Sequence, residues 1–320
     1  MDSLLTLSAK AAMTDNNIRM VNEQVKTTPE LANFPSRTVS GTHYYYLRHK
    51  DGDGSSVGFR EANNGIASSS DNYELVIAQM YILAARVELD KAVEDAYPGG
   101  PSAYEREITM RKGREVAAAI GHRVWYGDDA SSTGFNGFAK LLGTTAASSG
   151  GRVVFSDTTS AANNTSVYLV RYGDEGVSFD FGNNSTIRLS QFRTESIIGK
   201  NNEKHPGRVA DISGWMGMRL ATVEGAMRIA NVREESGKVG LSDKMVANAL
   251  RYWRGAPPSA IYMNRTAAYL LQCSRTHTTV QGPSARVSSA LGPFAPFPTE
   301  SQGIPIVITD ALTDSEAFVS

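Results

Sequence analysis

A β-rich stretch near the start of the chain carries aromatic and charged residues on both of its faces, and together with the turn that follows it predicts a β-hairpin. Two faces can be told apart from position 43 to 48: His43, Tyr45 and Leu47 on one, and Tyr44, Tyr46 and Arg48 on the other. The polar turn 50–56 contains two Asp-Gly pairs, and residues 57–62 then run back as the second strand. An isolated two-stranded hairpin is marginally stable in water, so we expect the rest of the chain or another chain to cover it.

The clearest helical pattern covers residues 104–126, where Val116, Ile120 and Val124 share one face. Ser102 is the expected N-cap, because a serine there precedes a glutamate by three residues, as in a capping box. At 1.5 Å per residue such a helix is about 35 Å long. This length predicts an extended element rather than a helix of a small compact domain.

Shorter elements are expected before and after this helix. The apolar stretch 75–87 fits a strand or a buried helix equally well, and residues 88–97 are expected to be helical. A stretch rich in Ser, Thr, Ala and Gly, 144–166, is expected to be a surface loop. The later elements are expected as short strands between 167 and 232, helices at 242–253 and 265–273, and a last strand in 304–312. This succession predicts an α+β fold.

Composition narrows the class of protein. The 320 residues are 41% hydrophobic and 20% charged, enough to build a core. The net charge of −1, without a cluster of lysine and arginine, argues against sequence-wide binding of nucleic-acid phosphates. The single cysteine, Cys273, excludes an intrachain disulfide and a cysteine metal cluster. The first residues lack a signal-peptide pattern, and the most apolar stretch is too short to cross a bilayer, so we expect a soluble protein made and kept in a cytoplasm.

Motifs for cofactor or metal chemistry are missing from the sequence. It contains no P-loop, no dinucleotide-binding glycine pattern, no nucleophile elbow and no HExxH pair. The stretch 51–53, Asp-Gly-Asp, resembles the start of a calcium loop, but the twelfth position holds Ala62 where a glutamate is needed. We expect no cofactor and no metal.

Two groups of residues remain as catalytic candidates. Cys273 and His277 lie four residues apart and could form a Cys–His pair. Separately, Asp90, His122 and the carboxylates near Asp90 could form the site of a hydrolase or transferase. A core thiol and a solvated helix start are the favoured interpretations, because nothing in the sequence brings the groups together.

The order of the elements resembles a tailed-phage major capsid protein of the Hong Kong 97 type. A polar arm, a hairpin, a long helix, a run of strands and a closing strand follow one another between residues 37 and 318. The most specific pieces are VWYGDD with GFNGFAKLL (124–142), MRIANV (227–232) and GIPIVITDAL (303–312). Each piece is weak alone, and their order and spacing carry the resemblance.

The resemblance implies the α+β Hong Kong 97-type capsid fold, with an N-terminal arm, an E-loop hairpin, a peripheral domain with a long spine helix, and an axial domain. It places the parts as follows: arm 1–35, E-loop hairpin 36–70, peripheral domain 71–144 with the spine helix at 104–126, further peripheral-domain strands 205–235, and mainly axial domain 236–320. The β-rich segment 145–204 is left unassigned.

The resemblance also implies a function without catalysis. Copies of the chain would assemble as hexamers and pentamers into an icosahedral phage head that encloses double-stranded DNA, without sequence-specific DNA contact. A scaffolding protein and a portal at one vertex are expected partners, and a cement or decoration protein is left open. The protein would belong to the virion after assembly in the bacterial cytoplasm.

A neighbouring subunit would then cover the hairpin, since the E-loop of such shells lies over the adjacent subunit. The candidate intersubunit contacts are Tyr44, Tyr45, Tyr46, Arg48, Lys50, Phe59 and Arg60. Some family members crosslink an E-loop lysine, but no matching partners for Lys50 are identified and this chemistry is not carried over. An encapsulin-like nanocompartment shell, which shares the fold, is the alternative, followed by a hydrolase and a phage binding module.

Overall fold

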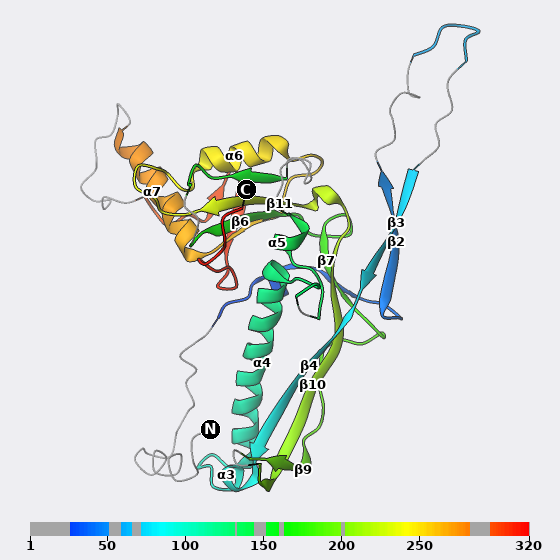
Figure 1. Ribbon diagram of the computed structural model, residues 1–320, viewed down its shortest axis with the longest axis vertical. Helices are drawn as coiled ribbons and strands as arrows, with labels where there is room; N and C mark the ends of the chain where they lie inside the picture. The colour runs from blue at the N-terminus through cyan, green and yellow to red at the C-terminus, as the bar shows by residue number, and fades with distance from the viewer. Residues whose placement is uncertain are drawn as a thin grey trace.

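The computed structural model describes residues 26–50, 59–65, 72–131, 133–143, 152–159, 163–199, 202–281 and 295–319. Residues 1–25 of the expected N-terminal arm and 51–56 of the expected hairpin turn therefore lie outside the described residues. Figure 1 shows three parts: a lobe that contains the C-terminus, a long blade below it, and a hairpin that projects beside the lobe. None of the described helices is long and apolar enough to cross a membrane.

The blade consists of helix α4 (Pro101–Tyr126) beside a ribbon of two long strands. Strand β4 (Tyr81–Asp90) pairs antiparallel with β10 (Lys204–Leu220), from Tyr81 opposite Met216 to Asp90 opposite Gly207. Alternate residues of β4 turn away from solvent, and two of them, Val87 and Leu89, are fully buried and form a core with Ile108 of α4. The expected long helix is confirmed and is held by this strip of apolar contacts along its length. It begins at Pro101 with Gly100 as N-cap, so the expected N-cap Ser102 is wrong; proline suits the first helical position because its φ is already helical.

The ambiguous stretch 75–87 is strand and not helix. It falls in β3 (Asn72–Gln79) and β4, which the buried Met80 separates. The helix expected over 88–97 is also corrected: β4 continues to Asp90, and only α3 (Lys91–Asp95) is helical. The side chain of Asp90 caps α3 by accepting a hydrogen bond from the amide of Ala92 at 2.9 Å. The strand wins because its alternate residues bury against α4.

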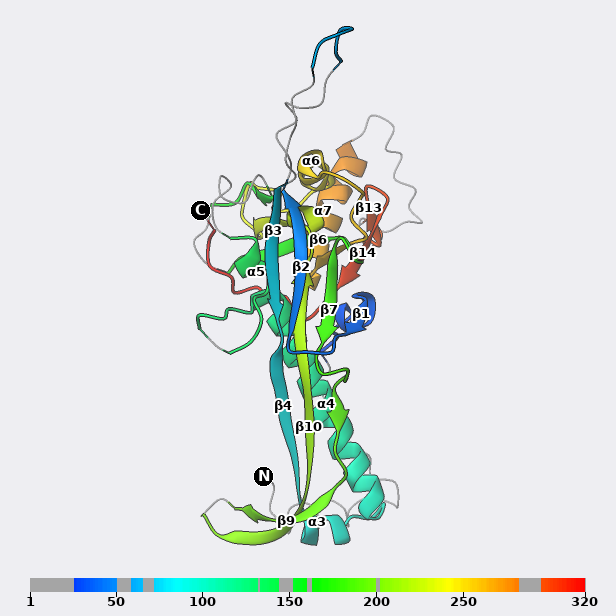
Figure 2. The same ribbon diagram turned by 90° about the vertical axis from the view of Figure 1, so that its right-hand side faces the viewer.

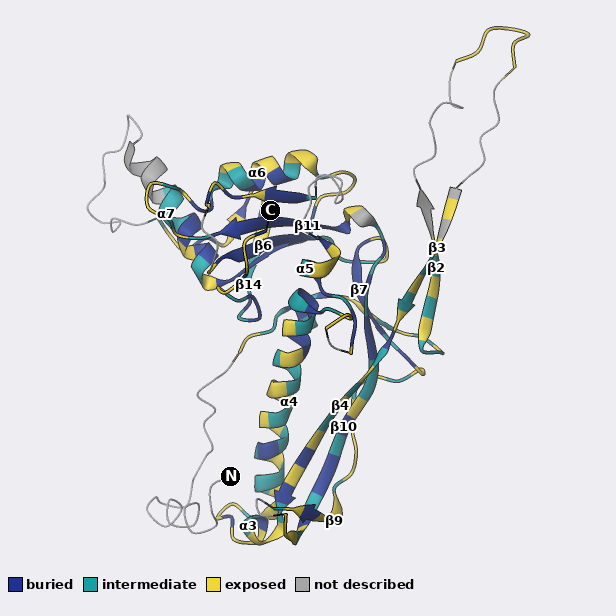
Figure 3. Ribbon diagram, in the orientation of Figure 1, coloured by how far each residue is buried: buried dark blue, intermediate teal, exposed yellow. Residues whose placement is uncertain are grey.

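The lobe is built on a mixed six-stranded sheet. Its order is β13 (Glu300–Ser301), β14 (Ile304–Ile308), β12 (Ala260–Met263), β6 (Thr165–Val170), β11 (Ala226–Val232) and β5 (Val153–Phe155). The three central strands are buried on both faces, as Figure 3 shows, which explains their uninterrupted apolar sequences. The loop expected over 144–166 is thus partly wrong, because β5 and the start of β6 lie within it.

Helices α6 (Asp243–Tyr252) and α7 (Arg265–Gln281) pack on one face of this sheet through a separate apolar core. Ser242 caps α6, and its hydroxyl accepts a hydrogen bond from the amide of Met245. On the other face an aromatic core joins the lobe to the blade: Trp125 at the end of α4 packs against Tyr168 and Tyr262 of the sheet. Short helices α2 (Glu30–Asn33) and α5 (Phe138–Leu141) border this core, and a 3-10 turn, Val223–Gly225, precedes β11.

Four further strands lie beside the blade ribbon. They are β1 (Ser36–Thr38), β7 (Val177–Phe181), β8 (Arg188–Leu189) and β9 (Arg193–Ile198); β1 pairs with β7, and the other three pair with β10. The unassigned segment 145–204 is therefore divided, with β5 and β6 in the lobe and β7 to β9 in the blade. Residues 205–235 divide too, because β10 belongs to the blade and β11 to the lobe.

The hairpin pairs β2 (His43–Lys50) with β3, from His43 opposite Gln79 to Lys50 opposite Asn72. The expected first strand is confirmed. The expected return strand 57–62 is wrong, because residues 59–65 are described and belong to no strand, and the return strand begins beyond residue 70. Figure 2 shows the hairpin as a ribbon that continues upward from β4 beside the lobe.

Candidate functional site

One face of the hairpin is apolar and exposed. Its members come from both strands, with Tyr45 opposite Ile77 and Leu47 opposite Leu75. Together with Tyr73 they are 54–66% exposed, and we call these five residues the apolar stripe. Large apolar side chains gathered on one face are typical of a surface that a partner covers. The stripe is therefore the strongest candidate for an interaction site among the described residues.

The opposite face of the hairpin packs on the same chain. The rings of Tyr44 and Tyr46 stack with their centres 6.2 Å apart. The Arg37 guanidinium lies 4.4 Å from the centre of the Tyr44 ring, and that of Arg219 lies 5.5 Å from Tyr44 and 5.7 Å from Tyr46. The Tyr46 hydroxyl donates to the carbonyl oxygen of Leu220 at 3.1 Å. Two arginines and one strand end thus hold this face to the body.

These arginines share a buried carboxylate. Arg37 Nε donates to Asp180 Oδ1 at 3.1 Å, and Arg219 Nε lies 3.7 Å from Asp180 Oδ2. Arg219 also donates to the Ser178 hydroxyl from Nε and Nη2, at 3.1 and 3.0 Å. Burial raises the pKa of Asp180, and the hydrogen bond from Arg37 opposes this rise. The base of the hairpin is thus a polar, desolvated cluster, unlike the apolar cores of lobe and blade.

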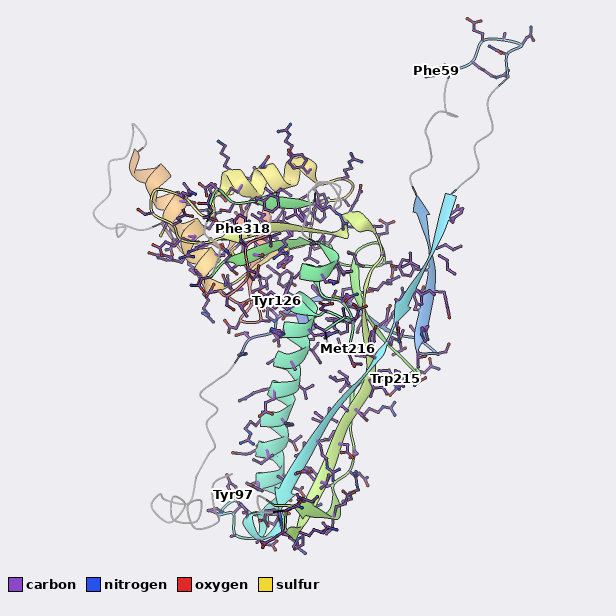
Figure 4. All side chains as sticks on the ribbon, viewed as in Figure 1. Phe59, Tyr97, Tyr126, Trp215, Met216 and Phe318 are labelled. Carbon is purple, nitrogen blue, oxygen red and sulfur yellow. The ribbon has the colours of Figure 1, made fainter. Side chains whose placement is uncertain are left out.

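The structure divides the seven residues predicted as contacts. Tyr45 lies on the exposed stripe, whereas Tyr44 and Tyr46 lie on the face held by the arginines. Arg48 and Lys50 end β2, but their side chains lie outside the described part of the structure. Phe59 is fully exposed at the far end of the hairpin, as Figure 4 shows, and Arg60 there donates to the Asn64 carbonyl oxygen at 2.9 Å.

Four members of the apolar stripe are not among the contacts predicted from the sequence. They are Leu47, Tyr73, Leu75 and Ile77. Three of them, Tyr73, Leu75 and Ile77, occupy alternate positions, as the side chains of one strand face do. This signal is weak because Val76 and Ala78 between them are apolar as well, and because the apolar run continues into β4 and also suits a helix.

The hydrolase hypothesis does not survive the geometry. Asp90 caps α3 at the lower end of the blade, where its carboxylate lies 3.9 Å from His205. His122 lies near the opposite end of α4 and packs on Tyr126, with the ring centres 5.1 Å apart. Glu94, the buried carboxylate of the cluster, pairs with Arg208 at 3.0 Å. The proposed catalytic groups therefore do not converge. Across the described ranges, no three His, Cys, Asp or Glu side chains are grouped to hold a metal.

Comparison with solved structures shows the fold. The chain is similar to the structure of bacteriophage Epsilon15, with a TM-score of 0.67 and 16% identity over 100% of this chain and 98% of that one. It is also similar to the bacteriophage JBD30 capsid, with a TM-score of 0.53 and 11% identity over 90% and 91% of the two chains. The Hong Kong 97-type fold that the sequence suggested is confirmed. The holo-SrpI encapsulin of Synechococcus elongatus is more distant, with a TM-score of 0.47 and 10% identity over 70% and 94% of the chains.

Comparison of sequences shows the family. No curated protein matches the chain. The family model described as major capsid protein GP7 matches residues 53–320, which include β3, the blade and the whole lobe. The chain therefore belongs to the major capsid protein GP7 family, whose members are structural proteins of the virion and not enzymes.

Proposed function

We propose that copies of this chain form the icosahedral shell of a phage head, as hexamers and pentamers, and that the hairpin of each copy docks on a second copy through its apolar stripe. The observation that carries the proposal is the exposure of Tyr45, Leu47, Tyr73, Leu75 and Ile77 on one face. In a major capsid protein the neighbour present at every position of the shell is another copy of the same chain.

The energetics favour this occupant. Fully burying a large apolar side chain contributes about 1.5–3 kcal/mol. Five such side chains at each hairpin are repeated at every contact of a symmetric shell, so modest contacts add up. A two-stranded ribbon is also marginal by itself in water, and docking would stabilise it.

The two sheets support a division into domains. We assign the blade, with α4 and strands β4 and β7 to β10, to the peripheral domain, and the lobe, with α6, α7 and the six-stranded sheet, to the axial domain. The hairpin from β2 to β3 is the E-loop, and the segment before β1 is the N-terminal arm. The boundary between the domains then falls between Leu220 and Ala226, where β10 ends and β11 begins.

Other partners follow from the family. A scaffolding protein during assembly and a portal at one vertex are proposed, because a closed shell needs a defined size and an entry point for DNA. Contact with the packaged DNA would be independent of sequence, since the chain has a net charge of −1 and no basic cluster.

Electron microscopy of the purified chain, with light scattering, tests the proposal. Shells, tubes or rings of five or six subunits are expected, either for the chain alone or after addition of its scaffolding protein. A monomer or dimer under all these conditions would contradict it.

A further inference from the structure

We propose that Arg37, Asp180 and Arg219 form a clamp on the rings of Tyr44 and Tyr46, and that this clamp sets the angle at which the hairpin leaves the body. The inference rests on the proposed function, because the angle decides where the apolar stripe meets a second copy. It assigns positioning roles to three residues that need not touch the neighbouring chain.

The hairpin needs such a clamp because β-pairing does not hold it to the body. Within the described residues β2 and β3 pair only with each other. Each strand joins the body through a short connection, 39–42 before β2 and Met80 after β3. The two connections share one backbone hydrogen bond, from the Met80 amide to the Thr42 carbonyl oxygen at 3.0 Å. A ribbon on two short connections pivots unless side chains restrain it.

The connections sit close to the body, which brings the rings within reach of the arginines. Added Cβ atoms on Gly182 and Gly217 would lie 3.0 Å from the Met80 sulfur and 2.8 Å from the Gln79 carbonyl oxygen. The absence of side chains at these two positions lets Met80 become buried at the pivot. The pivot therefore has a fixed position, and the remaining freedom is the direction of the ribbon.

The two arginines fix that direction. Arg219 is only 5% exposed, and the edge of its guanidinium contacts Ser178 and Asp180. The same guanidinium lies 5.5 Å from the centre of the Tyr44 ring and 5.7 Å from the centre of the Tyr46 ring. A planar guanidinium can bind an oxygen acceptor at its edge and a ring at its face, which an ammonium cannot do. Such contacts are stronger where water is excluded, as at this cluster.

Asp180 supplies the negative charge that balances the two arginines in this buried site. It is 1% exposed and lies between Arg37 and Arg219, and the exposed Asp174 lies 3.9 and 3.7 Å from the same two arginines. A buried arginine without a counter-charge would be strongly unfavourable. The three charged residues lie on three strands of one sheet, β1, β7 and β10. The clamp therefore fixes the orientation of the hairpin relative to that sheet.

Two double variants separate the clamp from simple packing. Tyr44→Leu with Tyr46→Leu keeps apolar volume but removes both rings, whereas Tyr44→Phe with Tyr46→Phe keeps the rings. Spin labels on Tyr73→Cys in β3 and Ser213→Cys in β10, in a Cys273→Ser background, report the distance between hairpin and body in unassembled subunits by pulsed electron paramagnetic resonance. Circular dichroism verifies that each variant is folded, and assembly is measured on unlabelled chains by light scattering.

The leucine pair is expected to widen the distance distribution at least about twofold and to slow assembly about tenfold, because three partly desolvated cation–π contacts are lost. The phenylalanine pair loses the hydroxyl bond of Tyr46 to the Leu220 carbonyl oxygen but keeps both rings, so it is expected to stay closer to the parent chain than to the leucine pair in both measurements. A leucine pair with a distribution as narrow as the parent, or a phenylalanine pair as broad as the leucine pair, would overturn the clamp.

A third variant distinguishes failure of the clamp from failure of the proposed function. Leu47→Ser with Leu75→Ser alters the stripe and leaves the clamp residues intact. If this variant loses assembly while the leucine pair assembles normally, docking by the stripe stands and the clamp is refuted. If this variant assembles normally, docking by the stripe is refuted, and the distance distributions alone decide whether the clamp exists.

Discussion

Glu30 packs its carboxylate directly onto Gly121 of helix α4. A Cβ atom added to Gly121 would lie 2.6 Å from Glu30 Oε1 and 2.7 Å from the Thr28 methyl group. The second oxygen of Glu30 accepts a hydrogen bond from the Thr309 hydroxyl at 3.0 Å. The segment just before β1 is thereby fixed to helix α4 of the blade and to the C-terminal segment at once. A glycine inside α4, close to its C-terminal end, weakens the helix itself, and this contact explains its presence there.

Gly121→Ala is expected to lower the free energy of unfolding by about 1–3 kcal/mol, because the new methyl group overlaps Glu30 and Thr28. The matched control is Gly113→Ala on the same helix, where an added Cβ meets nothing within 4 Å. That change is expected to raise stability by up to about 1 kcal/mol, since alanine is the better helix former. Urea denaturation of unassembled subunits measures both, and equal stability of the two variants would contradict the contact.

Glu30 also predicts a dependence of stability on pH. Burial raises the pKa of its carboxyl, the nearby Asp310 adds to the rise, and the Thr309 hydrogen bond opposes it. The folded state therefore binds the proton more tightly than the unfolded state. This tighter binding of the proton at Glu30 adds to the free energy of unfolding. The added stability is fully present below the unfolded pKa of about 4.3 and is lost as pH rises through the folded pKa.

Glu30→Gln removes this titration while keeping the shape of the side chain. The variant is expected to be more stable than the parent at neutral pH, and the difference is expected to shrink as pH falls toward about 4. Denaturant titrations at several pH values test this. A difference that grows on acidification would show the opposite sign and refute the interpretation.

The apolar stripe predicts a loss of assembly without a loss of fold. Leu47→Ser with Leu75→Ser removes a cross-strand pair that is 66% and 59% exposed in one chain, so the subunit has little packing to lose. The protein concentration needed for assembly is expected to rise at least about tenfold, the effect of roughly 1.4 kcal/mol. Val239→Ser, on a 49% exposed valine of the lobe, is the control. Equal assembly of stripe variant and control, by light scattering, would remove the stripe from the interface.

The loop after α4 needs a glycine at position 134, because a side chain there would overlap Arg123. Gly134 has φ +143°, and an added Cβ would lie 2.8 Å from Arg123, whose Nε donates to the Phe135 carbonyl oxygen at 2.7 Å. Gly134→Ala is expected to cost about 1–3 kcal/mol through backbone strain and overlap. Gly143→Ala, whose nearest neighbour would be 3.6 Å away, is expected to be nearly neutral. Thermal unfolding distinguishes them, and similar unfolding temperatures would refute the account of this loop.

The parts of the fold that the sequence predicts are those with one clear period. The helix α4, the strand from His43 and the short helix α6 follow from local patterns. The long strand β10 does not, because Pro206 and the glycines at 207, 214 and 217 imply a break. In the structure these glycines admit close neighbours: an added Cβ on Gly207 would meet the Ile197 side chain, and one on Gly214 would lie 2.9 Å from the Ile187 backbone.

The candidate site was predictable only in part for a similar reason. Tyr45 and its neighbours identify the hairpin, but the other half of the stripe begins at Tyr73 and becomes adjacent only through the register of β2 with β3. Arg37, Asp180 and Arg219 are far apart in the sequence and meet only because β1, β7 and β10 lie side by side. No local pattern carries a contact of that kind.

The structure of an assembled shell, determined by electron cryomicroscopy, would show whether the apolar stripe docks on a second copy of the chain. The account predicts that Tyr45, Leu47 and Leu75 are buried against a second copy of the chain, while the rings of Tyr44 and Tyr46 stay against Arg219 of their own chain. A shell in which this stripe faces solvent, or folds back onto its own subunit, would contradict the account.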